Sequence, residues 1–375
     1  MIFLDNASTT KAYEECLDIA KKYLFEQYYN PSAPYGKAIE VSKDIRSAKL
    51  KILRLLGGDG KIIFTASGTE SDNLALLGTR KINGSRIIIS QAEHPAVYNT
   101  AMELKQKGFD VVAVKTNNVG RVSISEFEKV MTKDTNLVSI MHVNNETGAI
   151  NDIKTLCNVA KGINPNVIFH SDGIQAVGKT KVSLRTLGVD LYSFSGHKFH
   201  APKGIGALYI KKGINLNPII FGGGQEDNLR SATENVPAIM SLAFALEKTI
   251  NNLDTNLAYA NEFRQMITKS LNDDCVKIIS DDNSIPFILS MALKYVRGEV
   301  MLHSLEKYGI MIGTGSACSN QKQSKRIPQL MQLSPEYHNG IIRVSFNSFN
   351  KKDDIEYFIK QLKLEYNTLI KYVRG

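Results

Sequence analysis

Short apolar runs that alternate with helical segments constrain the fold of residues 61–210 more than any other feature of this sequence. The runs predict buried strands at 61–65, 86–90, 111–114, 137–143, 167–171, 191–195 and 207–210. Helical patterns lie between several of them, including one that begins near residue 69 and others at 125–131 and 153–161. Strands that alternate with helices form a mainly parallel sheet with helices on both faces. This part of the chain is therefore predicted to be an α/β domain.

Two flanking regions complete the predicted architecture. A helix is expected over residues 35–57, because six apolar residues recur at steps of three and four and Gly57 and Gly58 end the pattern. Beyond about residue 250 the pattern changes to a polar helix near 251–271, strand-like segments and a final amphipathic helix. This last third is predicted to be a second, smaller α+β domain.

Charge and cysteine content exclude several classes of protein. The 46 Lys and Arg against 37 Asp and Glu leave a net charge of +9, which is spread along the chain. Such a surplus favours acidic partners or anionic substrates and does not by itself indicate nucleic-acid binding. The four cysteines are far apart, with no CxxC pair, so neither a disulfide framework nor a metal site is expected, and a reducing compartment is favoured.

Nothing in the hydropathy pattern indicates secretion or a membrane span. Asp5 interrupts the first residues before an apolar signal region forms. The longest uncharged apolar run, near 235–246, is shorter than the ~20 residues that a membrane helix needs. A soluble, cytoplasmic protein without a membrane partner is expected.

Lys198 is the most informative single residue in the chain. It follows the predicted strand 191–195 in the sequence Ser195-Gly196-His197-Lys198. Burial at a strand end would lower the pKa of the amine and favour the neutral nucleophile, which suits a Schiff base with a carbonyl cofactor. Taken alone, the segment also fits an ordinary surface lysine in a loop.

Two other strand ends carry groups that complement such a lysine. Asp172 ends the strand before Lys198, where a carboxylate would keep a pyridinium nitrogen protonated, and Gln175 follows three residues later. Gly68 and Thr69 open a helix after the strand 61–65, so backbone N–H groups and a hydroxyl can approach a phosphate. Each of these features alone fits a plain helix cap. Together they define one sheet edge, where open α/β sheets bind ligands.

The sequence resembles the group I, NifS- and IscS-like cysteine desulfurases, which are fold-type I pyridoxal phosphate (PLP) enzymes of the class V aminotransferase superfamily. The resemblance rests on segments in order along nearly the whole chain: FLDNASTT (3–10), FTASGTESDNLAL, AEHPAV, HVNNETGAI, HSDGIQAVGK, SFSGHKFHAPKGIGALY, GGGQEDNLRSATENVPAI, GTGSACSN and IIRVSF (341–346). It implies a large PLP-binding domain over residues 13–250, with a mainly parallel seven-stranded sheet. Residues 1–12 and 251–375 form the implied small α+β domain with the catalytic cysteine loop.

The resemblance also implies a role for each matching residue. The implied catalytic residues are Lys198, which forms the Schiff base and moves the substrate Cα proton, His94, which stacks on the cofactor ring as acid and base, and Cys318. The residues implied to bind PLP are Gly68, Thr69, His94, Asn145, Asp172, Gln175, Ser195, His197, Lys198 and Thr233. Among these, Thr233 is implied to reach the phosphate of a neighbouring subunit, hence a homodimer. Asn145 and Arg343 are implied to bind the substrate.

Cys318 selects among the reactions that this scaffold supports. It lies in the small-residue segment 313–320, whereas Cys16, Cys157 and Cys275 are expected on apolar faces. An exposed thiol on such a segment can ionise and attack sulfur. The expected activity converts L-cysteine to L-alanine and passes sulfur to Cys318 as a persulfide. A sulfur-acceptor protein would use it for Fe–S cluster assembly or for tRNA or cofactor thiolation.

Two alternatives remain open at this point. One is a selenocysteine or cysteine lyase on the same scaffold, although selenium release needs no persulfide-forming cysteine. The other is a non-catalytic scaffold that binds sulfur-trafficking partners, although both Lys198 and Cys318 are present.

Overall fold

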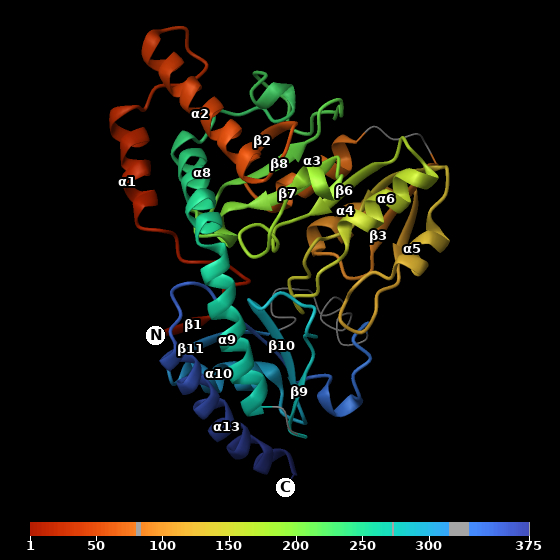
Figure 1. Ribbon diagram of the computed structural model, residues 1–375, viewed down its shortest axis with the longest axis vertical. Helices are drawn as coiled ribbons and strands as arrows, with labels where there is room; N and C mark the ends of the chain where they lie inside the picture. The colour runs from red at the N-terminus through yellow and green to blue at the C-terminus, as the bar shows by residue number, and fades with distance from the viewer. Residues whose placement is uncertain (80–83, 272–273, 315–329, 375) are drawn as a thin grey trace.

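The computed structural model describes residues 1–79, 84–271, 274–314 and 330–374 (Figure 1). Within these residues the chain builds a seven-stranded and a five-stranded sheet. The two sheets lie one above the other along the long axis of the molecule, with the larger sheet in the upper part of Figure 1. The C-terminal helix lies beside the smaller sheet at the lower end.

The large sheet is mainly parallel, as predicted. Its strands are β2 (Lys61–Thr65), β3 (Arg86–Ser90), β4 (Asp110–Val114), β5 (Thr135–Ser139), β6 (Ile168–Asp172), β7 (Leu191–Ser195) and β8 (Gly206–Ile210). They are ordered β2-β8-β7-β6-β5-β3-β4, and only β8, among these strands, runs antiparallel to its neighbours. The α/β fold class is therefore confirmed.

The fourth predicted strand differs from the prediction in its bounds. The segment predicted as 137–143 forms β5 over Thr135–Ser139 and then continues beside β6 with irregular bonds. Ile140 N donates to His170 O at 3.2 Å and His142 N donates to Asp172 O at 2.8 Å. The apolar run thus follows β6 beyond the regular strand, which explains why the pattern appeared longer.

Helices cover both faces of the large sheet. The helices of this part are α1 (Glu15–Lys21), a short π-helix (Lys22–Glu26), α2 (Gly36–Leu55), α3 (Gly68–Gly78), α4 (Pro95–Gln106), α5 (Ile124–Val130), α6 (Ile153–Ile163), α7 (Leu184–Leu187) and α8 (Val236–Asn251). Apolar residues of α2, α5, α6 and α8 pack on one face, and those of α3 and α4 pack on the other. Both faces of the sheet are apolar because side chains alternate along each strand. In β7, for example, Leu191 faces one helical layer, whereas Tyr192 and Phe194 face the other.

Helix α2 forms over nearly the range that the periodicity predicts. Ala38, Val41, Ile45, Ala48 and Ile52 are buried along one face. After the helix, Gly57 adopts a φ of +60°, the left-handed conformation that ends many helices. None of the helices in the described part of the chain is long and apolar enough to cross a bilayer.

The small sheet joins both ends of the chain. Its strands are β1 (Ile2–Leu4), β9 (Val276–Ile278), β10 (Ile288–Leu293), β11 (Ile310–Thr314) and β12 (Ile341–Ser345), in the order β1-β11-β12-β10-β9. Its core is shared with α9 (Leu253–Leu271), α10 (Gly298–Glu306) and α13 (Lys352–Arg374). Strand β1 runs parallel to β11, which places the first residues with the last third of the chain.

The central strand β6 offers a direct test of this packing. Phe169 is 0% exposed and lies between the sheet and the helices of one layer. Phe169→Ala is expected to lower the free energy of unfolding by about 3–5 kcal/mol, because the cavity cannot collapse between close-packed neighbours. Denaturant unfolding of the cofactor-free protein measures this loss. The control Tyr372→Ala removes an aromatic ring that is 81% exposed and should change stability little.

Candidate active site

The candidate site lies where β6, β7 and the start of α3 meet. Asp172 and Ser193 are paired residues of β6 and β7, and Lys198 follows β7 by one short turn. A Cβ added to Gly68 would lie 2.3 Å from Ile174 Cδ1 and 3.2 Å from Ser195 Cβ. The first residue of α3 therefore packs directly against the ends of both strands. This close approach favours glycine at the position, because a larger residue would displace the Ile174 side chain.

The N-terminus of α3 is built to accept an anion. Ser67 Oγ accepts the N–H of Glu70 at 3.1 Å, and Glu70 Oε2 accepts the N–H of Ala66 at 2.9 Å. The amides of Gly68 and Thr69 belong to the first turn, where a helix supplies no carbonyl partner. The helix dipole adds a partial positive charge there, and Thr69 is exposed. A phosphate group suits this position.

Asp172 is a buried carboxyl group at the end of β6. It is 3% exposed, and Ile174 N donates to its Oδ1 at 2.9 Å. Burial raises its pKa to about 6, whereas the backbone hydrogen bond and the charge of Lys198 act in the opposite direction. A cationic nitrogen brought beside this group would favour the ionised carboxylate.

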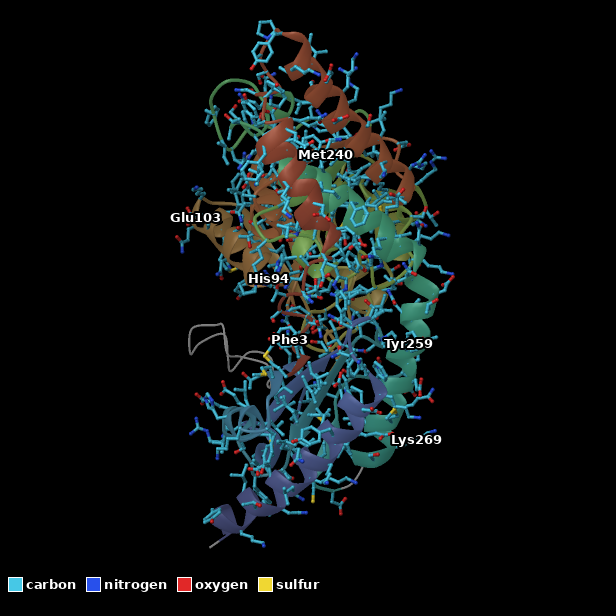
Figure 2. All side chains as sticks on the ribbon, turned by 90° about the vertical axis from the view of Figure 1, so that its left-hand side faces the viewer. Phe3, His94, Glu103, Met240, Tyr259 and Lys269 are labelled. Carbon is cyan, nitrogen blue, oxygen red and sulfur yellow. The ribbon has the colours of Figure 1, made fainter. Side chains whose placement is uncertain are left out.

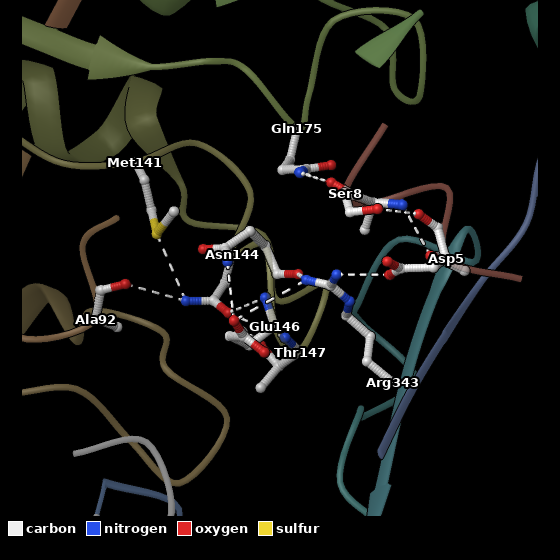
Figure 3. A network of polar contacts seen from close by, with 12 residues as sticks. Asp5, Ser8, Ala92, Met141, Asn144, Glu146, Thr147, Gln175 and Arg343 are labelled. Atoms are coloured by element: carbon white, nitrogen blue, oxygen red, sulfur yellow. Dashed lines mark hydrogen bonds and ion pairs between the residues drawn. The ribbon is translucent and has the colours of Figure 1, made fainter. Parts of the chain in front are cut away.

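Lys198 is held by the carbonyl groups of the N-terminal segment. Its Nζ donates to Ala7 O at 2.8 Å and to Ser8 O at 2.7 Å. Gln175 Nε2 donates to the same Ala7 oxygen at 2.8 Å. Figure 3 shows Gln175 beside Ser8. The structure thus brings together two of the predicted residues through backbone oxygens that the sequence pattern did not indicate.

The two predicted histidines lie on different elements of the large sheet's part of the molecule. His197 Nδ1 is 3.1 Å from Thr9 Oγ1, and burial lowers the pKa of His197 to about 4. His94 forms the N-cap of α4, where its Nδ1 accepts the N–H of Ala96 at 3.1 Å. Figure 2 shows His94 at the lower end of the upper part of the molecule, above Phe3 of the small sheet.

Arg343 lies on β12 and reaches across to the large sheet. Its Nη2 donates to Asp5 Oδ1 at 2.8 Å and its Nη1 donates to Asn145 O at 2.8 Å (Figure 3). Glu146 Oε1 is 4.0 Å away, and burial raises the pKa of Glu146, although the charge of Arg343 opposes this. The structure therefore joins the two residues that were expected to bind substrate, Asn145 and Arg343. The role of Asp5, which orients the guanidinium, was not predicted from the sequence.

A neutral polar pair lies beneath the strand ends and was not predicted. His170 Nε2 is 3.6 Å from Asp72 Oδ1, and both side chains are fully buried. Nδ1 of His170 contacts Ser139 Oγ at 2.8 Å, and Nε2 of His170 contacts Ser193 Oγ at 2.9 Å. Burial raises the pKa of Asp72 and lowers the pKa of His170 to about 3, so the neutral forms are favoured.

One predicted residue, Thr233, lies outside this cluster of contacts. Thr233 is exposed and lines a cavity of about 210 Å³, together with Ala66 and Gly204. No hydrogen bond from Thr233 to Gly68 or Thr69 is present in the described part of this single chain. Cys318 lies outside the described residues.

The three remaining cysteines differ in burial. Cys16 and Cys157 are buried in the large core, as expected for structural cysteines. Cys275 is only partly buried, at the edge of the small core.

The residues at the strand ends fit PLP. A lysine amine, a buried carboxyl group and a helix N-terminus lie together, and they match an aldehyde, a pyridinium nitrogen and a phosphate. The close packing of Gly68 against Ser195 places the phosphate position next to β7.

The sequence is similar to those of known proteins over nearly its whole length. The family "Aminotransferase class-V" matches residues 2–358. A cysteine desulfurase, IscS, of Dictyoglomus turgidum is 36% identical over 96% of this chain and 93% of its own length. The cysteine desulfurase NifS of Azotobacter vinelandii is 30% identical over 96% of this chain and 91% of its own length.

Solved structures show the same fold. A NifS-like protein superposes with a TM-score of 0.92 at 34% identity, covering 98% of this chain and all of the other. A second structure, SspA in complex with cysteine, has a TM-score of 0.82 at 29% identity and covers 94% of this chain and all of the other. The chain therefore belongs to the class-V aminotransferase family and, within it, to the PLP-dependent cysteine desulfurases.

Proposed function

We propose that this chain converts L-cysteine to L-alanine and that Cys318 receives the sulfur as a persulfide. The observation that carries the proposal is the meeting of Lys198, Asp172 and the start of α3 at one edge of the large sheet. When bound, PLP supplies an electron sink for the electron pair left on the substrate Cα. The remaining steps belong to residues of this chain.

Asp172 and the start of α3 are proposed to fix the two ends of the cofactor. The buried carboxylate of Asp172 would pair with the ring nitrogen and keep it protonated. Gly68, Thr69, Ser195 and His197 would hold the phosphate, with the low pKa of His197 making it a neutral hydrogen-bonding partner. Gln175 and Asn145 are assigned to the phenolic oxygen.

Lys198 and His94 are proposed to move protons. The carbonyl oxygens of Ala7 and Ser8 hold the Lys198 amine at a defined position, from which it would take the Cα proton and return it. His94, at the N-cap of α4, is assigned the second acid and base role.

Arg343 is proposed to bind the substrate carboxylate, together with Asn145. Asp5 holds one edge of the guanidinium, so the side chain is oriented before substrate arrives. Arginine suits this role because it pairs with a carboxylate through two hydrogen bonds.

The step after persulfide formation on Cys318 requires a second protein that accepts the sulfur. We assign the product persulfide to a sulfur-acceptor protein, for Fe–S cluster assembly or for tRNA thiolation, in the cytoplasm. The names of the related proteins, which are cysteine desulfurases, support the release of sulfur from cysteine that both uses need. The resemblance to cysteine desulfurases assigns Thr233 to the phosphate of a neighbouring subunit, so the active form would be a homodimer. The exposure of Thr233 in its own subunit leaves it accessible for this role.

The domain boundaries are proposed on the same basis. Residues 13–250 would form the PLP-binding domain, and residues 1–12 and 251–375 the small domain that carries Cys318. The pairing of β1 with β11 supports the inclusion of the N-terminal residues in the small domain.

The Schiff-base role of Lys198 predicts a loss of both colour and turnover. Lys198→Ala should abolish alanine formation from cysteine and lose the visible absorption band of the PLP-loaded protein, since no other amine occupies this position. Absorption spectra and an alanine assay measure the two effects. Lys203→Ala changes an exposed lysine of the same loop and should retain both. A mutant of Lys198 with the wild-type spectrum would contradict the assignment.

The packing around Arg343 predicts that a substitution at Gly313 weakens the binding of cysteine. A Cβ at Gly313 would lie 2.6 Å from Asp5 Oδ1 and 3.1 Å from Arg343 Nη2. Gly313→Ala should therefore displace the guanidinium and raise the KM for cysteine about tenfold, the equivalent of about one hydrogen bond to a charged group. Gly162→Ala is the control, because its Cβ would meet no atom within 4 Å. An unchanged KM would indicate that another residue binds the substrate carboxylate.

The assignment of Cys318 predicts where sulfur accumulates. After one turnover without reductant, mass spectrometry should find one added sulfur on Cys318, because a thiolate there attacks the substrate sulfur. Cys318→Ser should still bind PLP and cysteine but form almost no alanine. Cys275→Ser, at the partly buried cysteine, should behave as wild type. Full alanine production by Cys318→Ser would refute the persulfide mechanism and favour a lyase.

A further inference from the structure

Lys179 is a buried lysine at the site that the proposed reaction does not use. It is 5% exposed, and its Nζ donates to Gln175 Oε1 at 2.5 Å. Burial, together with the charges of Lys198 and Arg343, lowers its pKa well below the ordinary value. A buried amine is costly unless it has a specific partner. Its position therefore requires an explanation.

The partners of Gln175 leave its carboxamide only one orientation. Ala7 O can only accept a hydrogen bond, so the group that faces it must be the NH₂ of Gln175. Lys179 donates to the other end of the amide, which must then be the oxygen. Reversing the amide would place two acceptors together at Ala7 O and would remove the acceptor that the Lys179 amine donates to.

The fixed NH₂ group lies next to the amine of Lys198. Both nitrogens donate to the same oxygen, Ala7 O, each at 2.8 Å. In PLP the phenolic oxygen is on the ring carbon next to the one that bears the aldehyde. A cofactor joined to the Lys198 amine would therefore carry this oxygen close to the neighbouring NH₂ group, which could donate to it.

We propose that Lys179 is a positioning residue that fixes the carboxamide of Gln175 with its NH₂ group toward Lys198 and the phenolic oxygen of PLP. The role rests on the PLP binding in the proposed function, but it does not depend on sulfur transfer. Without the lysine, the Gln175 oxygen loses its donor. Only the bond to Ala7 O then holds the carboxamide, so the NH₂ group is less firmly fixed toward Lys198.

PLP affinity and the pH titration of the visible absorption test this role. Lys179→Met retains the length and the apolar stem but removes the donor. It should weaken the binding of PLP to the cofactor-free protein about tenfold. It should also raise the midpoint of the absorption titration by about one pH unit, because a donor at the phenolic oxygen favours its deprotonated form. Lys179→Arg, which also only donates, should restore most of both values.

A double-mutant cycle separates positioning from a general structural effect. Gln175→Leu should weaken PLP binding to a similar extent, and adding Lys179→Met to it should cause no further loss. Losses that multiply would show that Lys179 acts independently of Gln175 and would overturn the inference. Wild-type affinity and titration in Lys179→Met would overturn it too.

A control variant and a replacement variant complete the test of Lys179. Lys161→Met removes another lysine of the large domain, paired with Asp190 at 2.6 Å, and should leave PLP affinity and the titration unchanged. If Lys179→Met does not fold, Lys179→Leu replaces it, because a leucine side chain also lacks a donor for the Gln175 oxygen. A wild-type protein that binds PLP but forms no alanine would refute the proposed function and leave the test of Lys179 intact. A wild-type protein that does not bind PLP would refute both.

Discussion

The backbone of residues 5–13 connects the small sheet to the lysine of the site, and the arrangement of the other groups depends on it. At one end, Ala7 N donates to Ser345 Oγ at 2.8 Å. In the middle, the carbonyls of residues 7 and 8 hold the Lys198 amine, and at the other end Thr10 N donates to His197 O at 2.9 Å. Because these bonds use backbone atoms, they fix the spacing between the two sheets without a dedicated side-chain pattern.

This dependence explains what could be predicted from the sequence. The strands and helices of the large sheet follow from local periodicity, and the ends of β6 and β7 placed Asp172 and Lys198 at one edge. The carbonyl partners of Lys198 could not be predicted, because they are about 190 residues away in the chain and every residue has a carbonyl group. Lys179 lies in a recognised segment, but its role depends on the orientation of one amide.

The charges at the site have a collective effect on stability. Lys179, Lys198 and Arg343 lie close enough for the charge of each of the last two to lower the pKa of the first. Asp5 neutralises Arg343 only at one edge. A phosphate-bearing cofactor and a substrate carboxylate add negative charge to this group of cations, so binding relieves repulsion that the empty protein contains. Ligand binding is therefore expected to stabilise the fold beyond its direct contacts.

The parallel pairing of β1 with β11 also affects how the chain folds during synthesis. Ile2 lies opposite Ile310, so the first strand leaves the ribosome long before its partner exists. The large sheet, whose strands all lie between Lys61 and Ile210, can form in the meantime. Residues 1–13 must then remain unpaired on one side until β11 and β12 are complete. The carbonyl groups around Lys198 take their final place only after β11 and β12 have been made, so a growing chain becomes competent for its cofactor later than its large sheet forms.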